Sequence, residues 1–256
     1  MTTIGFIGVG DLAVYTVKGL RGGDYAGRIL LSPRNNLKSS LLQREYGCEV
    51  QSDNQAVVAG ADYVFIATRP DDCLDTLAPL EFRAGQVLVS VVAGVDTATL
   101  RRALPAELEI VRAMPVSSAE AGASPTLVYP DHDFVRELFV HSGNAIAVDN
   151  EEYFNQGSIL ACVYSWFFEL YGELIRATQG PKLPAALSAQ LVTGMAQGAA
   201  RLALAKPDTP PAEIAAGIAT EGTYSKLGLD LLQQRHAFGP WREACKLLEA
   251  RLAANE

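Results

Sequence analysis

Apolar and polar positions are arranged in two different ways along the chain, and the change falls past its middle. In the first part, short apolar runs are separated by segments in which apolar positions recur every three or four residues. Runs such as Val64-Phe65-Ile66 and Val87-Leu88-Val89 are apolar at every position, as in strands that helices cover on both faces. The pattern therefore predicts βαβ units and a parallel sheet.

The predicted strands are short apolar runs bounded by polar or glycine residues, and they are Thr3–Ile7, Arg28–Leu31, Tyr63–Ala67, Val87–Val91, Glu109–Ala113, Thr126–Tyr129 and Ala145–Val148. The predicted helices lie between them, and they are Leu12–Arg21, Leu37–Tyr46, Asn54–Ala59, Asp72–Leu77 and Thr97–Ala103. Gly47 and Gly60 are expected at helix ends, because glycine readily adopts the left-handed conformation that often follows a helix.

After Asn150 the strand signals stop and helical patterns continue. A long apolar and aromatic stretch leads into alanine-rich segments, which predict helices at Pro184–Lys206, Pro211–Gly217, Tyr224–Gln234 and Pro240–Ala254. We therefore expect an α/β domain over residues 1–149 and an all-helical domain over residues 150–256. Several of the later helices are too apolar for a solvated surface, which predicts a homodimer or a larger oligomer formed through this half.

Composition excludes several classes of protein. The 256 residues carry a formal net charge of −8, which disfavours nucleic acid or an anionic membrane as a partner. The cysteines and histidines are too scattered for a metal site, so no metal is expected. The start of the chain lacks the pattern of a secretory leader, and the longest apolar run, Ile159–Phe168, is too short to span a bilayer. We expect a cytoplasmic protein.

A glycine-rich segment stands between the first predicted strand and the first predicted helix. Residues Gly8-Val9-Gly10-Asp11-Leu12-Ala13 fit the pattern G-x-G-x-x-A. In such a turn Gly8 permits the change of direction, Gly10 lets the backbone approach a pyrophosphate, and Ala13 keeps the helix close to the sheet. The helix N-terminus offers free N–H groups to the phosphates. These features predict a doubly wound, dinucleotide-binding Rossmann domain, in which Asp11 adds a negative charge beside the cofactor.

The end of the second predicted strand bears on the choice of dinucleotide. Domains that prefer NAD usually carry an acidic residue there, which accepts a hydrogen bond from the ribose 2′-hydroxyl. This chain has none over residues 31–36. Ser32, Arg34 and Asn35 instead offer one fixed cation and two neutral donors to a 2′-phosphate. The sequence therefore favours NADP over NAD.

Four stretches of the chain resemble segments of the pyrroline-5-carboxylate reductase family, over almost the whole length of the chain. They are Ile4–Gly10, Val64–Pro70, Ser90–Val95 and Val111–Pro115. The resemblance implies further cofactor contacts at Thr68, Arg69, Pro70, Ala93, Gly94, Met114 and Pro115. Enzymes of this family reduce a cyclic imine to proline with a nicotinamide cofactor, and their helical C-terminal domain dimerises. The resemblance thus implies an NADP-dependent oxidoreductase that acts on a carbon–nitrogen double bond.

The chain departs from the family on the substrate side. Val116 stands where the family has asparagine, and residues 157–161 read Gly-Ser-Ile-Leu-Ala instead of Gly-Ser-Gly-Pro-Ala. Residues 220–225 read Thr-Glu-Gly-Thr-Tyr-Ser, where the family has the loop that holds the substrate carboxylate. Glu221 places a second carboxylate at that position, and like charges a few ångströms apart repel. We therefore expect an imine substrate other than pyrroline-5-carboxylate.

Imine reduction requires chiefly that the imine carbon be held against the nicotinamide and that water be excluded. The candidate catalytic residues are Thr223, Tyr224 and Ser225. Thr223 and Ser225 are suited to hydrogen-bond an anionic group, and Tyr224 to donate a proton or to stack. The alternative is that this segment only caps a helix beginning near Ser225. Ser158 has the same two interpretations, as a substrate contact or as a cap.

Two other functions remain as alternatives. A β-hydroxyacid dehydrogenase shares the domain plan, but resemblance to that family would imply a catalytic lysine, and residues 157–176 contain none. A non-catalytic NADP-binding or regulatory protein is the third interpretation, and it would bind NADPH without turnover of a cyclic imine.

Overall fold

The structure is a computed structural model that describes residues 2–253. It divides into two compact units, one formed by residues 2–161 together with Leu252 and Ala253, the other spanning Cys162–Arg251. The division therefore falls within helix α7 (Glu151–Thr178) rather than at the predicted position between residues 149 and 150. The reason is that the first turns of α7 are packed within the first unit, where Phe154 and Ile159 are buried.

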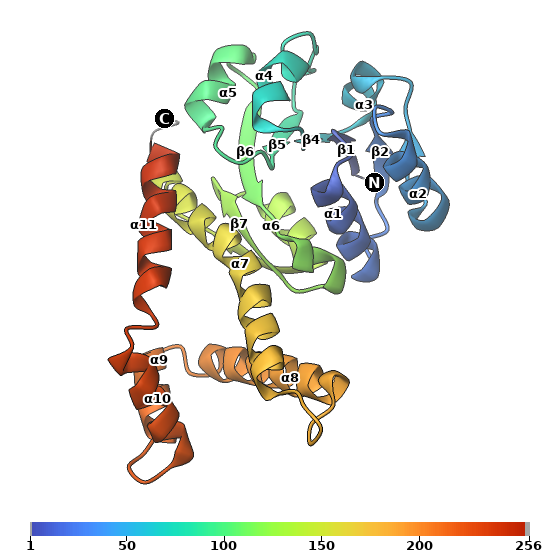
Figure 1. Cartoon of the computed structure of the whole chain (residues 1–256). Coiled ribbons are helices and arrows are strands. Elements are labelled where there is room, and N and C mark those ends of the chain that lie inside the picture. Colours follow the sequence, from blue (N-terminus) through green and yellow to red (C-terminus); the bar gives the residue numbers. More distant parts are fainter. Residues whose placement is uncertain (1, 254–256) are drawn as a thin grey trace. The chain divides into compact units, whose positions relative to one another are not determined.

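The first unit is built on one sheet, which within the described residues has eight strands in the order β3-β2-β1-β4-β5-β6-β7-β8 (Figure 1). The strands are β1 (Thr3–Ile7), β2 (Arg28–Leu31), β3 (Glu49–Val50), β4 (Tyr63–Ile66), β5 (Val87–Ser90), β6 (Glu109–Met114), β7 (Ser124–Tyr129) and β8 (Gly143–Ala147). Neighbouring strands are parallel except β6 and β7. The predicted doubly wound sheet is confirmed.

Helices cover both faces of this sheet, as the fully apolar strands predict. Side chains alternate along each strand, so Phe65 packs on one face while Val64 and Ile66 pack on the other. Helices α1 (Asp11–Gly22), α2 (Asn36–Tyr46) and α6 (Asp133–Val140) cover the Phe65 face. Helices α3 (Asn54–Gly60), α4 (Pro70–Leu77) and α5 (Thr97–Ala103) cover the opposite face. Burying one such phenylalanine stabilises the fold by about 1.5–3 kcal/mol.

The described residues of the second unit are helical, with a single isolated bridge between Gly180 and Leu183. Besides the later part of α7 they form α8 (Ala185–Leu204), α9 (Pro211–Ile218), α10 (Tyr224–Gln234) and α11 (Gly239–Ala253), the last of which ends in the first unit. Within this unit α7 contacts α11 through Trp166 and Trp241, whose ring centroids lie 5.9 Å apart. The predicted helical C-terminal half is confirmed.

Large apolar side chains remain exposed on α7 and α8. They are Phe167, Phe168, Leu170, Leu174, Leu187, Leu191 and Met195. By length and composition α7 would also suffice to cross a membrane. One such helix is weak evidence for a membrane span, because long helices of soluble proteins meet the same criteria. The apolar surface formed by these α7 and α8 residues requires an explanation.

Candidate active site

The turn between β1 and α1 is shaped by Gly8. Its φ of +90° lies in the region that favours glycine, and a Cβ atom there would approach the Ala67 carbonyl oxygen to 2.7 Å. The Gly8 N–H donates a hydrogen bond to Ser32 Oγ at 3.0 Å. The turn is thus held against the ends of both neighbouring strands, β2 and β4, and no other residue fits this position without displacing backbone.

Gly10 leaves the N-terminus of α1 open. It is the N-cap residue, no side chain caps the helix there, and a Cβ atom at Gly10 would meet nothing within 4 Å. Leu12 is half-buried, and Ala13 is buried against the sheet. Free N–H groups at a helix N-terminus, beside a residue without a side chain, suit a pyrophosphate. The residues present therefore fit the dinucleotide that the motif predicts.

The charge of Asp11 is balanced by Lys38, a residue that lies outside the predicted cofactor segments. Lys38 Nζ lies 2.8 Å from Asp11 Oδ1, and the Asp11 carboxylate itself is 70% exposed. Lys38 lies in the first turn of α2, so the topology brings it to the same end of the sheet as the α1 N-terminus. The order of the residues gives no signal for this pair, because it depends on the packing of α1 beside α2.

The three residues predicted to hold a 2′-phosphate have different environments. Ser32 is fully buried and accepts the hydrogen bond from Gly8. Asn35 donates to the Val9 carbonyl oxygen at 3.1 Å and accepts from the Lys38 N–H at 3.3 Å, so it caps α2 and steadies the turn. Arg34 is 75% exposed, with Asp72 Oδ2 at 3.7 Å. Ser32 and Asn35 therefore support the turn, and Arg34 is the most exposed of the three.

The remaining predicted cofactor contacts follow β4, β5 and β6. Strand register aligns Ile7 with Ile66 and Ile66 with Ser90, so the carboxyl ends of β1, β4 and β5 share one edge. At this edge lie the predicted cofactor segments, namely Gly8–Ala13, Thr68–Pro70, Ala93–Gly94 and Met114–Pro115. Thr68 Oγ1 is buried there without a hydrogen-bond partner in the described structure, and Pro115 is buried. In open α/β sheets ligands bind at this edge, where the strand order reverses.

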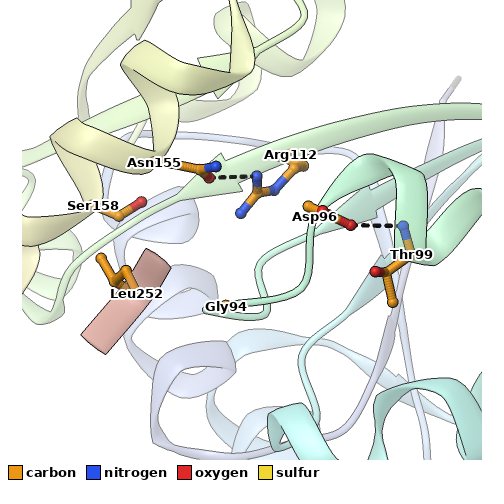
Figure 2. A pocket seen from close by; sticks show the side chains of 7 residues that line it. All are labelled: Gly94, Asp96, Thr99, Arg112, Asn155, Ser158 and Leu252. Atoms are coloured by element: carbon orange, nitrogen blue, oxygen red, sulfur yellow. Dashed lines mark hydrogen bonds between the residues drawn. The ribbon is translucent and has the colours of Figure 1, made fainter. Parts of the chain in front are cut away.

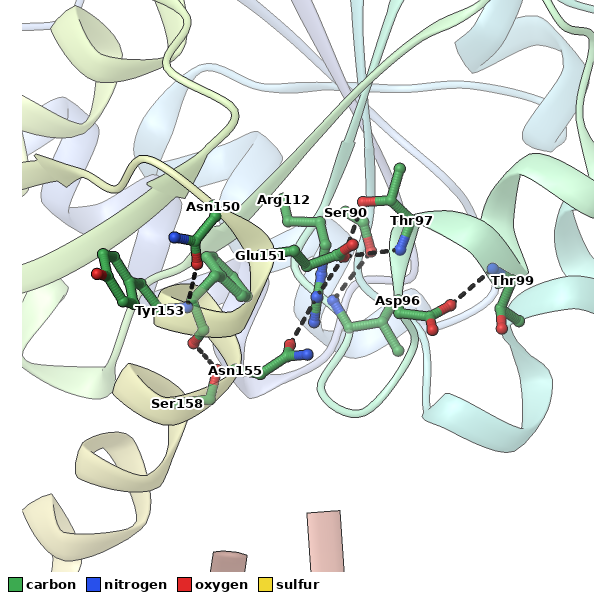
Figure 3. A network of polar contacts seen from close by, with 12 residues as sticks. Ser90, Asp96, Thr97, Thr99, Arg112, Asn150, Glu151, Tyr153, Asn155 and Ser158 are labelled. Carbon is green, nitrogen blue, oxygen red and sulfur yellow. Dashed lines mark hydrogen bonds and ion pairs between the residues drawn. The ribbon is translucent and has the colours of Figure 1, made fainter. Parts of the chain in front are cut away.

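A buried ionic network lies within the first unit, between β6, α7 and the loop after β5 (Figure 3). Arg112 Nη1 donates to Glu151 Oε1 at 2.7 Å and to Asn155 Oδ1 at 2.8 Å. The same Glu151 oxygen accepts from the backbone N–H and the hydroxyl of Thr97, each at 2.8 Å. The guanidinium also lies over the Phe154 ring, with 4.4 Å from Cζ to the ring centroid. Arg112 lies in the family-like segment Val111–Pro115, but nothing in the sequence indicated Glu151 and Asn155 as its partners.

A small pocket borders the network (Figure 2). It is lined by Gly94, Asp96, Thr99, Arg112, Asn155, Ser158 and Leu252, all of the first unit. Asp96 caps α5, since its Oδ1 accepts from the Thr99 N–H at 2.6 Å. That hydrogen bond, more than the nearby Arg112 charge, lowers the pKa of Asp96 below its ordinary value. Ser158 donates its hydroxyl to the Phe154 carbonyl oxygen and also lines the pocket.

The predicted catalytic residues lie at the start of α10 in the second unit. Thr223 is the N-cap of that helix, and its Oγ1 accepts from the Lys226 N–H at 3.2 Å. Tyr224 is 94% exposed, and Ser225 is also exposed. Thr223 therefore performs the capping role named as the alternative, and a catalytic role for the three residues stays a prediction. Among the described residues, no three His, Cys, Asp or Glu side chains are placed to hold a metal ion.

Comparison with known proteins gives similarities to reductases. Residues 3–94 match the family described as "NADP oxidoreductase coenzyme F420-dependent". The pyrroline-5-carboxylate reductase of Vibrio alginolyticus is 27% identical over 233 residues, which cover 86% of this chain and 85% of that protein. The resemblance predicted from the motifs is confirmed.

Solved structures show the same fold. The 1-pyrroline-5-carboxylate reductase of Streptococcus pyogenes matches with a TM-score of 0.87 at 21% identity, covering 98% of each chain. The pyrroline carboxylate reductase of Plasmodium falciparum, solved with NADP bound, also matches with a TM-score of 0.87, at 17% identity over 99% of this chain and 98% of that one. The arrangement of elements is thus that of these reductases.

Proposed function

We propose that this chain, a relative of the pyrroline-5-carboxylate reductases, is an NADP-dependent oxidoreductase that reduces a carbon–nitrogen double bond. The observation that carries the proposal is the open α1 N-terminus at Gly10, on the sheet edge shared by the other predicted cofactor segments. Reduced nicotinamide, when bound, supplies the hydride for such a reaction. Residues 1–149 are the cofactor domain in this proposal, and residues 150–256 contribute to the substrate site.

Arg34 and Lys38 support NADP as the dinucleotide. The loop after β2 carries no acidic side chain for a ribose 2′-hydroxyl, whereas Arg34 is exposed and Lys38 follows one turn later. Lys38 already neutralises Asp11 at the α1 N-terminus. With Asp11 neutralised by Lys38, the exposed Arg34 is the cation that favours the additional 2′-phosphate of NADP. The Plasmodium falciparum structure with NADP bound agrees with this assignment.

The substrate is a small cyclic imine in this proposal, as the names of the relatives suggest. When the nitrogen of an imine is protonated, the imine carbon is already electrophilic. The protein therefore needs chiefly to position that carbon and to exclude water. The altered loop at residues 220–225 supports an imine other than pyrroline-5-carboxylate, since Glu221 adds a negative charge there.

A homodimer or larger oligomer is also part of the proposal. The exposed apolar surface of α7 and α8 includes Phe168 and Met195, and a contiguous surface of this kind usually marks an interface. Burial against a second copy accounts for the apolar character of α7 without a membrane.

We place the protein in the cytoplasm, because its four cysteines are free, as is usual in reducing compartments.

The test is to follow NADPH oxidation at 340 nm with a panel of cyclic imines that includes pyrroline-5-carboxylate. Turnover of at least one imine, with a preference for NADPH over NADH, is expected. Turnover of pyrroline-5-carboxylate itself would contradict the proposed change of substrate but not the reaction class. NADPH binding without turnover of any imine would favour a non-catalytic NADP-binding protein, and the absence of nucleotide binding would refute the proposal entirely.

A further inference from the structure

Lys38 is a cation at the unfavourable end of its own helix. It stands in the first turn of α2, where the helix dipole favours anions rather than cations. That turn contains no acidic residue to offset the charge of Lys38. The lysine Nζ instead reaches the Asp11 carboxylate at the start of α1, at 2.8 Å from Oδ1. The position of Lys38 is therefore explained by Asp11 rather than by the stability of α2.

Hydrogen bonds fix Lys38 beside the glycine-rich turn. Its backbone N–H donates to Asn35 Oδ1 at 3.3 Å, and the Asn35 amide donates to the Val9 carbonyl oxygen at 3.1 Å. Asn35 thus ties the first turn of α2 to the residue between Gly8 and Gly10. The Lys38 side chain is 31% exposed, so it is partly shielded from water. Backbone and side chain together hold this cation at the α1 N-terminus.

Asp11 is the first residue of α1, where the pyrophosphate is predicted to bind. The Val14 N–H donates to the Gly10 carbonyl oxygen, so the N–H groups before Val14 have no partner within the helix. An unpaired Asp11 carboxylate would oppose an anionic pyrophosphate at these groups, because like charges repel at short range. Among the described residues, Lys38 is the only cationic side chain that forms an ion pair with Asp11.

We propose that Lys38 determines how tightly the chain binds the pyrophosphate of its dinucleotide, by neutralising Asp11. This inference rests on the proposed NADP-dependent function and deepens it. Lys38 is a positioning residue here, since it acts through Asp11 and not on the reacting atoms. NADP and NAD share the pyrophosphate, so Lys38 contributes equally to the binding of both. Arg34 differs, because the 2′-phosphate that it is predicted to contact belongs to NADP alone.

The experiment measures binding of NADPH and of NADH by fluorescence titration to the wild type, Lys38→Met, Asp11→Asn and the double variant. Lys38→Met leaves Asp11 unpaired and is expected to weaken binding of both nucleotides by about fivefold. Asp11→Asn removes the negative charge and is expected to strengthen binding of both by a similar factor. The double variant has the same summed charge as the wild type, so its affinities are expected to lie within about twofold of the wild-type values.

Lys18→Met is the matched control. Lys18 lies about two turns further along α1, its Nζ pairs with Glu120 Oε2 at 3.1 Å, and its side chain is also 31% exposed. Its removal is expected to leave both affinities unchanged. Salt gives a second readout. The loss in Lys38→Met should nearly disappear at about 1 M salt, where the Debye length falls to about 3 Å, whereas a loss caused by altered packing would remain.

The inference is overturned by a Lys38→Met variant that binds both nucleotides as the wild type does, or whose loss is insensitive to salt. A loss confined to NADPH would overturn it as well, since Lys38 would then contact the 2′-phosphate. A double variant that binds as weakly as Lys38→Met would mean that Lys38 contacts the pyrophosphate itself. Thermal melting verifies that each variant is folded. If Lys38→Met does not fold, Asp11→Asn decides, because unchanged or weaker binding in that variant would contradict the inference.

The titrations involve no imine, so this inference and the proposed function fail in different ways. Nucleotide binding that depends on Lys38, without turnover of any imine, would contradict the proposed reduction and leave the inference standing. Unchanged binding in Lys38→Met, with imine turnover by the wild type, would contradict the inference alone. A wild-type protein that binds neither nucleotide would contradict both.

Discussion

Gly8 and Gly10 have different surroundings, although they belong to the same turn. Gly8 has φ +90° and faces the Ala67 backbone, whereas the space beside Gly10 is open. Gly10 has φ −87°, which any residue can adopt. The fold therefore needs a glycine at position 8, while at position 10 the open space matches the approach of a ligand.

These surroundings predict that an alanine at position 8 lowers stability, whereas an alanine at position 10 weakens cofactor binding. Gly8→Ala is expected to lower the free energy of unfolding by about 1–3 kcal/mol or more, because of backbone strain and the contact with Ala67. Gly10→Ala is expected to change it by less than about 1 kcal/mol and yet to weaken NADPH binding by roughly tenfold, since the methyl group fills the space of the pyrophosphate. Urea unfolding and a fluorescence titration measure both quantities. Unimpaired NADPH binding by Gly10→Ala would contradict the assignment of the site.

Arg34 predicts the preference between the two dinucleotides. Removing it with Arg34→Ala is expected to weaken NADPH binding by an amount equivalent to about 1.5–3 kcal/mol, the contribution of a hydrogen bond to a charged group, and to leave NADH binding nearly unchanged. Arg44→Ala is the matched control, because Arg44 is an exposed arginine on α2, the helix that follows the loop of Arg34. Equal losses for NADPH and NADH would show that Arg34 does not contact the 2′-phosphate.

Some residue roles were predictable from the sequence and others were not. The pattern G-x-G-x-x-A identifies the turn because Gly8 meets a local backbone requirement and Gly10 leaves space beside the helix N-terminus. It could not show that Ser32 and Asn35 would be used to support the turn, since those hydrogen bonds cross between strands and loops. Nor could it show the Arg112–Glu151 pair, which joins β6 to α7 only after the sheet has formed.

At the scale of elements, the buried strands were the most predictable. β1 and β2 have the predicted bounds because their apolar runs end at glycine or polar residues. β3 was missed because it is two residues long, and α6 because its apolar side chains Val135, Leu138 and Phe139 lie in a short segment between two strands. The antiparallel pairing of β7 was missed as well, since the direction of a strand depends on its connections and not on its own residues.

Helix α5 provides a prediction that depends on pH. Asp96 caps α5, and the Thr99 N–H holds its pKa below the ordinary value of 3.8. Replacing it in Asp96→Ala is expected to lower the free energy of unfolding at pH 7 by about 0.5–2 kcal/mol. Because the folded-state pKa is depressed, this contribution is complete above the ordinary value and is lost as pH falls through the lowered one.

Urea unfolding at several pH values measures the difference between the wild type and Asp96→Ala, which should shrink below about pH 4. Asp208→Ala is the control, since Asp208 is exposed between α8 and α9 and caps no described helix. A difference that stays constant down to pH 2 would show that the Asp96 carboxylate does not supply the stabilisation.

At the scale of the whole molecule, the change of pattern after Asn150 predicted two parts, but the compact units divide later, within α7. Periodicity shows where strands stop. It does not show that the next helix begins by packing in the first unit through Phe154 and Ile159. The boundary between the two units therefore depends on tertiary packing as well as on the pattern of apolar and polar positions.

The exposed apolar surface of α7 and α8 predicts self-association. Size-exclusion chromatography with light scattering at micromolar concentration is expected to give at least twice the 27.4 kDa of one chain. Met195→Lys, in the middle of the exposed α8 surface, should shift the population toward monomer, since a buried unpaired charge is costly at an interface. A monomeric wild-type protein would contradict the proposed oligomer.

In the proposed function the chain transfers a hydride from NADPH to an imine carbon, and isotope labelling shows whether this transfer occurs. The protein is incubated with NADPH deuterated at the nicotinamide C4, in each of its two stereoisomers, and with the imine that supports the fastest NADPH oxidation. We expect the amine product to gain one deuterium from one stereoisomer and none from the other. NADPH consumption without deuterium in the product from either stereoisomer would contradict the proposed function.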